Sequence, residues 1–184
     1  MKTIQILFLW LLSFSSNAQE GAVQCWAKLE KHCGKAFQGE IIAGMTDDFK
    51  DKQLVMHIRS CAPGQMRIPF LVGDNRSRTW VLTLADSTMT LKHDHRHEDG
   101  HPDKVTWYGG SATNAGSSSM QIFPADEETR RIIPAASANV WWITIDDHYF
   151  TYNLRRLGSE RLFTVRFDLT RPVAAPQAPW GWRD

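Results

Sequence analysis

Residues 88–101 read Thr-Met-Thr-Leu-Lys-His-Asp-His-Arg-His-Glu-Asp-Gly-His and contain four of the seven histidines. Apolar residues at Met89 and Leu91 alternate with polar ones, and successive side chains of a β-strand point to opposite faces. The stretch therefore predicts a strand whose buried face carries Met89 and Leu91. The same parity continues at three histidines: His93, His95 and His97.

The opposite parity of this strand is polar. Lys92, Asp94 and Arg96 alternate in charge, which predicts a solvated face. Glu98–Asp103 contains Asp-Gly and a proline and predicts a turn. Val105–Tyr108 then predicts a returning strand. Turns of this length fix register weakly; one possible register sets Val105 opposite His97, Trp107 opposite His95, and Gly109 opposite His93.

The histidine face predicts a binding site. Side chains two apart on one strand face are roughly 6.5–7 Å apart, so two imidazoles can converge on one metal ion. Neutral imidazole suits zinc or copper, which are the cofactors we expect. The predicted metal ligands are His93, His95 and His97, and the predicted ligand-binding residues add Trp107 and Tyr108. A further metal ligand would come from another strand, with four candidates left open: His57, His148, Asp146 and Glu98.

The N-terminal residues predict export. Met1–Ala18 has one lysine, then a mostly apolar run, then Ser16-Asn17-Ala18, as in a secretory signal peptide. No later stretch is long and apolar enough to cross a bilayer as a helix. We therefore expect a periplasmic or extracellular protein. The chain carries a net charge of +1, which falls to zero without Lys2, so nucleic acid is not an expected partner.

Three cysteines follow the predicted signal peptide: Cys25, Cys33 and Cys61. In an oxidising compartment two of them are expected to pair and one is left over. We favour Cys33–Cys61, because both residues border predicted strands. The pairing Cys25–Cys61 is the alternative.

The rest of the chain predicts an all-β domain. Some nine or ten short strands at regular spacing favour an antiparallel meander barrel of the lipocalin kind, or else a sandwich. A short helix is expected over residues 23–32. A second is expected over 126–133, which begins with acidic and ends with basic residues. Residues 109–119 predict a loop at the surface, either ordinary or acting as a lid.

Three segments make up the predicted organisation: a signal peptide over 1–18, one β-barrel-like domain over 19–171, and an extended tail rich in proline and alanine over 172–184.

Several motifs together resemble a set of exported bacterial proteins with no assigned function. They are Cys33–Gly39, Ile68–Asp74, His93–Gly100, Tyr108–Gly110 and Phe167–Pro172. A looser similarity is to lipocalin-type barrels and to the heme-binding barrels of the nitrobindin kind. In those barrels a Gly-x-Trp-x-Gly motif occupies the place of Gly34–Gly39, where Phe37 stands for the tryptophan. No C-terminal heme-ligand motif is clear, so heme is a less favoured cofactor than zinc or copper.

Three classes of function compete. The first is an exported barrel that holds a transition metal or a small ligand at the histidine face. The second is an envelope interaction protein in which the histidine hairpin is only a polar rim. The third, less favoured, is a hydrolase that pairs a histidine with a carboxylate. A general base needs its partner within hydrogen-bond reach, and on a regular strand Asp94 points away from its neighbouring histidines. Overall the sequence leans away from an enzyme.

Overall fold

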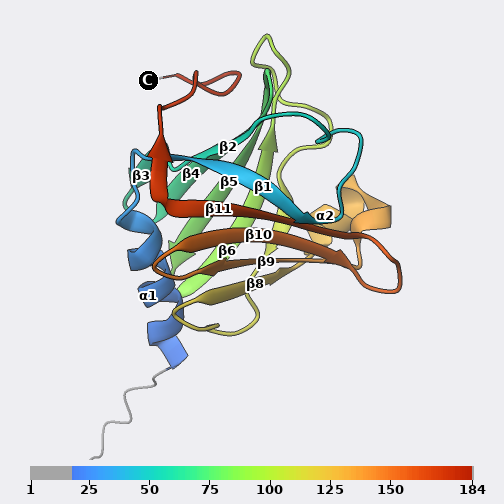
Figure 1. The fold of residues 1–184 in the computed structure, drawn as a ribbon. Coiled ribbons are helices and arrows are strands. Elements are labelled where there is room, and N and C mark those ends of the chain that lie inside the picture. The colour runs from blue at the N-terminus through green and yellow to red at the C-terminus, as the bar shows by residue number, and fades with distance from the viewer. Residues whose placement is uncertain (1–17, 184) are drawn as a thin grey trace, which may run out of the picture.

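The fold is a nearly closed antiparallel β-barrel with one helix at each side, as Figure 1 shows. The computed structural model describes residues 18–183. Its helical elements are α1 (Ala18–Glu30), α2 (Glu127–Ile132) and the 3-10 turn η1 (Pro134–Ala136). Its strands are β1 (Ala36–Ala43), β2 (Leu54–His57), β3 (Ser60–Ala62), β4 (Gln65–Val72), β5 (Asn75–Ala85), β6 (Thr88–His95), β7 (Tyr108–Ser111), β8 (Met120–Pro124), β9 (Asn139–Ile145), β10 (Tyr149–Arg156) and β11 (Leu162–Val173).

The strands form one sheet in the order β7-β6-β5-β4-β2-β1-β11-β10-β9-β8, with β3 paired to β4. Every pairing is antiparallel. Alternation of apolar and polar residues places one face of each strand in the core, as β9 and β11 show most clearly. The prediction of an antiparallel all-β barrel with two short helices is confirmed.

The two edge strands, β7 and β8, close the barrel at a seam. Gly110 of β7 lies so close to β8 that a Cβ atom would collide with the Pro124 carbonyl oxygen. The Asp126 N–H donates to the Gly109 carbonyl at 3.0 Å across the same seam. Residues 109–111 were predicted as part of a loop, and that prediction is wrong. Their small side chains serve strand closure instead.

Helix α2 fastens this seam. The Thr129 hydroxyl is completely buried, accepts from the Gly109 N–H at 2.6 Å and donates to the Gly109 carbonyl at 2.7 Å. Asp126 caps the helix by accepting from the Thr129 N–H at 2.8 Å. Lys92 of β6 pairs with both Asp126 and Glu128. The sequence predicted this helix one residue longer at each end.

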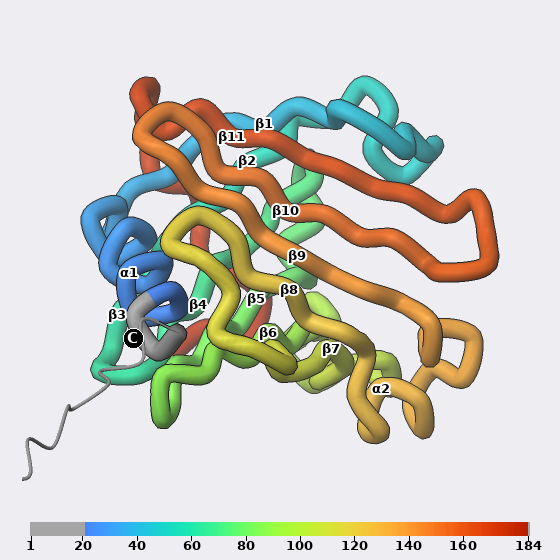
Figure 2. Tube along the Cα trace, turned by 90° about the horizontal axis from the view of Figure 1, so that it is seen from below, coloured from blue at the N-terminus to red at the C-terminus, as the bar shows by residue number. Residues whose placement is uncertain are grey.

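Helix α1 covers the end of the barrel that lies away from the β10–β11 turn (Figures 1 and 2). Its buried face is formed by Ala22, Cys25, Trp26 and Leu29. Cys33, just after the helix, forms a disulfide with Cys61 of β3, which confirms the favoured pairing. Cys25 is a free, buried thiol. The predicted signal peptide falls almost entirely outside the described residues. None of the described helices is long and apolar enough to span a membrane.

Candidate functional site

Strand β6 carries two histidines into the barrel. His93 continues the buried face of Met89 and Leu91, and only 3% of it is exposed. It pairs with Trp80 of β5, and His95 pairs with Arg78. The inward orientation predicted from the alternation is therefore present at His93, and half-buried His95 continues it to the barrel mouth.

The hydrogen bonds of His93 fix its tautomer. Its Nδ1 lies 3.0 Å from the Tyr108 carbonyl oxygen, which can only accept, so Nδ1 carries the proton. The Nε2 atom of the neutral ring is then an acceptor, and the Tyr152 hydroxyl donates to it at 2.7 Å. The imidazole also stacks on the Tyr108 ring, with centroids 4.5 Å apart and planes 9° from parallel. Two hydrogen bonds and one stacked ring therefore fix the position of the His93 imidazole.

His95, two residues after His93 on β6, joins the same cluster nearer to the barrel mouth. Its Nε2 lies 3.0 Å from the Tyr108 hydroxyl. Burial lowers the pKa of His93 to about 3 and that of His95 to about 4, and the charge of Arg78 adds to the effect on His95. Both rings are neutral near pH 7. Burial likewise raises the pKa of Tyr108 to about 12 and that of Tyr152 above its usual value, so both phenols keep their protons.

These four side chains line a cavity of about 450 Å³. One wall is a stack of aromatic rings: Trp80 lies 4.9 Å from Phe70 and 4.4 Å from Tyr152, nearly parallel to both. The remaining lining includes the apolar residues Phe49, Phe163 and Leu154, the charged residues Arg78, Arg161, Asp48 and Glu160, and the polar residues Thr46 and Thr79. Two lining residues, Glu160 and Arg161, belong to the β10–β11 turn. Figure 1 shows this turn on the opposite side of the barrel from α1. We call this cavity the inner cavity.

The structure separates His97 from the other two histidines. Strand β6 ends at His95, and His97 is exposed in the turn that follows, where its N–H donates to the His101 carbonyl. Trp107 is also largely outside, with 41% of its surface exposed. Of the predicted ligand-binding residues, His93, His95 and Tyr108 come together and His97 and Trp107 do not line the inner cavity.

The predicted register of the histidine hairpin is wrong. Arg96 pairs with Pro102, residues 103–107 then loop out, and His93 pairs with Tyr108 rather than Gly109. The loop ends at Trp107, whose φ of +58° turns the chain back into β7. This left-handed conformation in a tryptophan gave no signal in the sequence, where glycine or asparagine is the usual mark.

None of the four candidates for a further metal ligand lines the inner cavity. Glu98, Asp146 and His148 are exposed, whereas His57 is buried in β2. Within residues 18–183, no three side chains of histidine, cysteine, aspartate or glutamate are grouped as metal ligands would be. The choice of zinc or copper stays a prediction.

Sequence reasoning missed Arg78 and Trp80, which lie on the neighbouring strand β5 opposite His95 and His93. It also missed Tyr152 and Arg161, which come from β10 and the turn that follows it. Tyr152 did carry a signal, because it shares the buried parity of Phe150 and Leu154 in β10. Its meeting with His93 depends on how β10 and β6 lie across the closed barrel, and no local pattern encodes that.

The outer face of β6 also differs from the prediction of a solvated surface. Asp94 is only 6% exposed and lines a pocket whose other lining residues include parts of the hairpin loop and the C-terminal tail. It accepts from the Arg96 Nε at 3.0 Å and from the Thr106 hydroxyl at 3.3 Å.

Comparisons of the chain with models of protein families, with curated proteins and with solved structures find no match. The assignment of a function therefore depends on the geometry of the site.

Proposed function

We propose that this protein binds a small organic ligand with a flat apolar part in the inner cavity. The observation that carries the proposal is a cavity of about 450 Å³ with aromatic walls and a fixed polar floor. Ligand sites are typically 300–1,000 Å³, mostly apolar, with a few well-placed polar groups, and small barrels hold one such ligand. The floor here is the His93–Tyr152 and His95–Tyr108 pairs.

The low pKa values of the two histidines in the floor favour binding over acid–base catalysis. A general base works best when its pKa lies near the working pH. With pKa values of about 3 and 4, His93 and His95 are weak bases near neutrality. They serve better as fixed groups that hold the hydroxyls of Tyr152 and Tyr108 in place for a ligand.

An organic ligand is also favoured over a metal ion. Each imidazole Nε2 already has a tyrosine hydroxyl within hydrogen-bond distance, at 2.7 and 3.0 Å. A metal at these nitrogens would have to displace both phenols and would lose both hydrogen bonds. Zinc or copper bound at His93 and His95 is the alternative that the experiment below distinguishes.

The test uses the uncharged fluorescent aromatic amine N-phenyl-1-naphthylamine, which lacks an oxyanion, as a probe with the whole chain. We expect saturable one-to-one binding that His95→Trp abolishes by filling the mouth of the cavity. The matched control, His97→Trp, adds the same side chain on the exposed turn and should bind as the parent does. Equal binding by both variants would contradict the proposal. Stoichiometric zinc in native mass spectra, lost in His95→Ala, would establish the metal alternative instead.

We also infer that the protein works in an oxidising compartment after export. The Cys33–Cys61 disulfide supports this, because such bonds persist in periplasmic and extracellular proteins and are rare in the cytosol. Fusion of residues 1–24 to a reporter that folds only after export tests the inference. A reporter retained in the cytoplasm would contradict it.

A further inference from the structure

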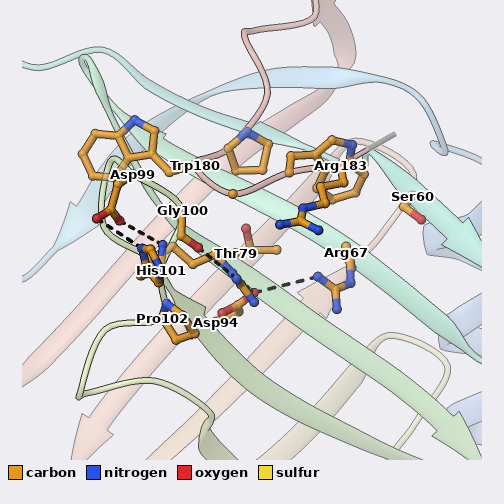
Figure 3. Close-up of a pocket in the computed structure, with 14 residues that line it drawn as sticks. Ser60, Arg67, Thr79, Asp94, Asp99, Gly100, His101, Pro102, Trp180 and Arg183 are labelled. Atoms are coloured by element: carbon orange, nitrogen blue, oxygen red, sulfur yellow. Dashed lines mark hydrogen bonds and ion pairs between the residues drawn. The ribbon is translucent and has the colours of Figure 1, made fainter.

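A second cavity, of about 670 Å³, lies on the outside of the sheet. Its floor includes Thr79 of β5 and Asp94 of β6, and Arg67 of β4 forms part of one side. Side chains alternate along β6, so this outer pocket and the inner cavity lie on opposite faces of the same strand. Figure 3 shows Arg67 reaching toward Asp94, with Arg183 above them and His101 on the far side.

The C-terminal tail forms one wall of the outer pocket. The backbone N–H of Trp180 donates to the Arg76 carbonyl at 3.1 Å. The Arg76 guanidinium donates to the Ala178 carbonyl at 2.9 Å. Gly181 packs on Gly100 so closely that a Cβ on Gly100 would lie 2.9 Å from the Gly181 Cα. The guanidinium of Arg59 lies over the Trp182 ring, 5.0 Å from its centroid. These contacts hold two indoles beside the pocket.

Among residues 18–183, three arginines line the pocket against two carboxylates. The arginines are Arg67, Arg96 and Arg183, and the carboxylates are those of Asp94 and Asp99. Asp99 pairs with His101 at 3.2 Å, at the edge of the pocket. Asp94 accepts from Arg96, and its carboxylate lies 3.8 Å from an Arg67 nitrogen. One buried carboxylate thus orients two guanidiniums without neutralising both.

Donors remain for a ligand. A guanidinium has five N–H groups, and Arg96 uses its Nε toward Asp94 and one Nη1 hydrogen toward the Gly100 carbonyl at 3.1 Å.

We propose that the outer pocket binds a small molecule that has an oxyanion group joined to a flat apolar part. The guanidiniums of Arg67, Arg96 and Arg183 hold the oxyanion, because a planar fork of N–H donors matches carboxylate and phosphate oxygens. The indoles of Trp180 and Trp182 supply an apolar wall for the flat part. The pocket is far larger than an inorganic ion requires. The proposal is independent of the function assigned to the inner cavity.

The test is calorimetric titration of the whole chain with phenyl phosphate. We expect one site, and tighter binding than inorganic phosphate because the phenyl ring contacts the indoles. Arg67→Gln and the exposed Arg183→Gln should each weaken binding about tenfold, as expected for loss of a charged hydrogen bond. Removal of residues 179–184 should weaken it further. Benzyl alcohol, which lacks the oxyanion, should not bind at this site.

The matched control is Arg161→Gln, which removes an arginine from the inner cavity and should leave the affinity for phenyl phosphate unchanged. The proposal is overturned if phenyl phosphate does not bind, or if Arg67→Gln and Arg183→Gln both bind as the parent does. Weakening by Arg161→Gln alone would place the anion in the inner cavity and would also overturn it. Circular dichroism of each variant shows whether it is folded. If Arg67→Gln does not fold, the exposed variant Arg183→Gln still tests the proposal.

Discussion

At the scale of single residues, His93 connects the fold and the inner cavity. The carbonyl of Tyr108 fixes the proton on Nδ1, and Tyr152 donates to Nε2. The imidazole therefore presents no free nitrogen, and the Tyr152 oxygen retains its accepting lone pairs. A ligand that donates a hydrogen bond to this oxygen would meet a group whose position is already set, which lowers the entropic cost of binding.

Tyr152→Phe should lower the free energy of unfolding by about 1–3 kcal/mol, because the buried His93 Nε2 loses its donor. The measurement is urea denaturation. The matched control is Tyr149→Phe in the same strand, at a residue that is 38% exposed, and it should change stability little. A loss of the same size in both variants would contradict the role given to Tyr152.

Stability should fall as the pH is lowered from 6.5 toward 5. The pKa values of folded His93 and His95 lie below the unfolded value of about 6.5, so the unfolded chain binds more protons in this range. Above pH 6.5 both histidines are neutral in the folded and in the unfolded chain, so their contribution to stability is complete. Below pH 6.5 the unfolded chain takes up protons that the folded chain does not, and this contribution is lost progressively until the pH reaches the folded pKa values. Each histidine contributes a slope of at most about 1.4 kcal/mol per pH unit. Urea midpoints measured at pH 7, 6 and 5 test this, and His93→Gln should flatten the slope; equal midpoints would contradict it.

At the scale of elements, one buried hydroxyl group, that of Thr129, attaches α2 to β7. The helix has only six residues, too few to be stable alone, and its place depends on tertiary contacts. Thr129 bonds both backbone groups of Gly109, and Lys92 reaches across from β6. The helix thus joins β7 to the turn that follows β8.

Thr129→Val should cost about 1–3 kcal/mol, because it keeps the shape but leaves the buried Gly109 N–H without a partner. Amide exchange in β7 should speed up more than exchange in β4. Thr113→Val, at an exposed position of the neighbouring loop, is the control and should leave both unchanged. Unaltered exchange in β7 would show that the seam closes without the threonine.

At the scale of the whole molecule, the disulfide ties the end of α1 to β3. It closes a loop with a sequence separation of 28 residues that contains β1 and β2. Cross-linking such a loop restricts the unfolded chain and stabilises the fold by about 3–4 kcal/mol.

The double variant Cys33→Ala with Cys61→Ala should therefore unfold at a clearly lower urea concentration than the parent. A reductant should destabilise the parent toward the same midpoint and should have no effect on the double variant. Equal midpoints for the oxidised parent and the double variant would rule out this contribution.

The sequence predicted the features that repeat along one strand and missed those that depend on distant strands. Alternation at Met89 and Leu91 indicated correctly that His93 faces inward, and the strand count indicated a barrel. The loop before Tyr108 ends at Trp107 with a positive φ, which has no mark in the sequence. The partner of His93 is Tyr152, 59 residues away, so closure of the barrel decides the contact.

The free thiol of Cys25 has a practical consequence. It lies completely buried on the inner face of α1, and burial raises its pKa to about 12, so almost none of it is thiolate at neutral pH. Maleimide reagents, which attack the thiolate, should leave the folded chain unlabelled. A cysteine introduced at an exposed position such as Thr113 can then carry a dye or spin label by itself, with the native cysteines left in place.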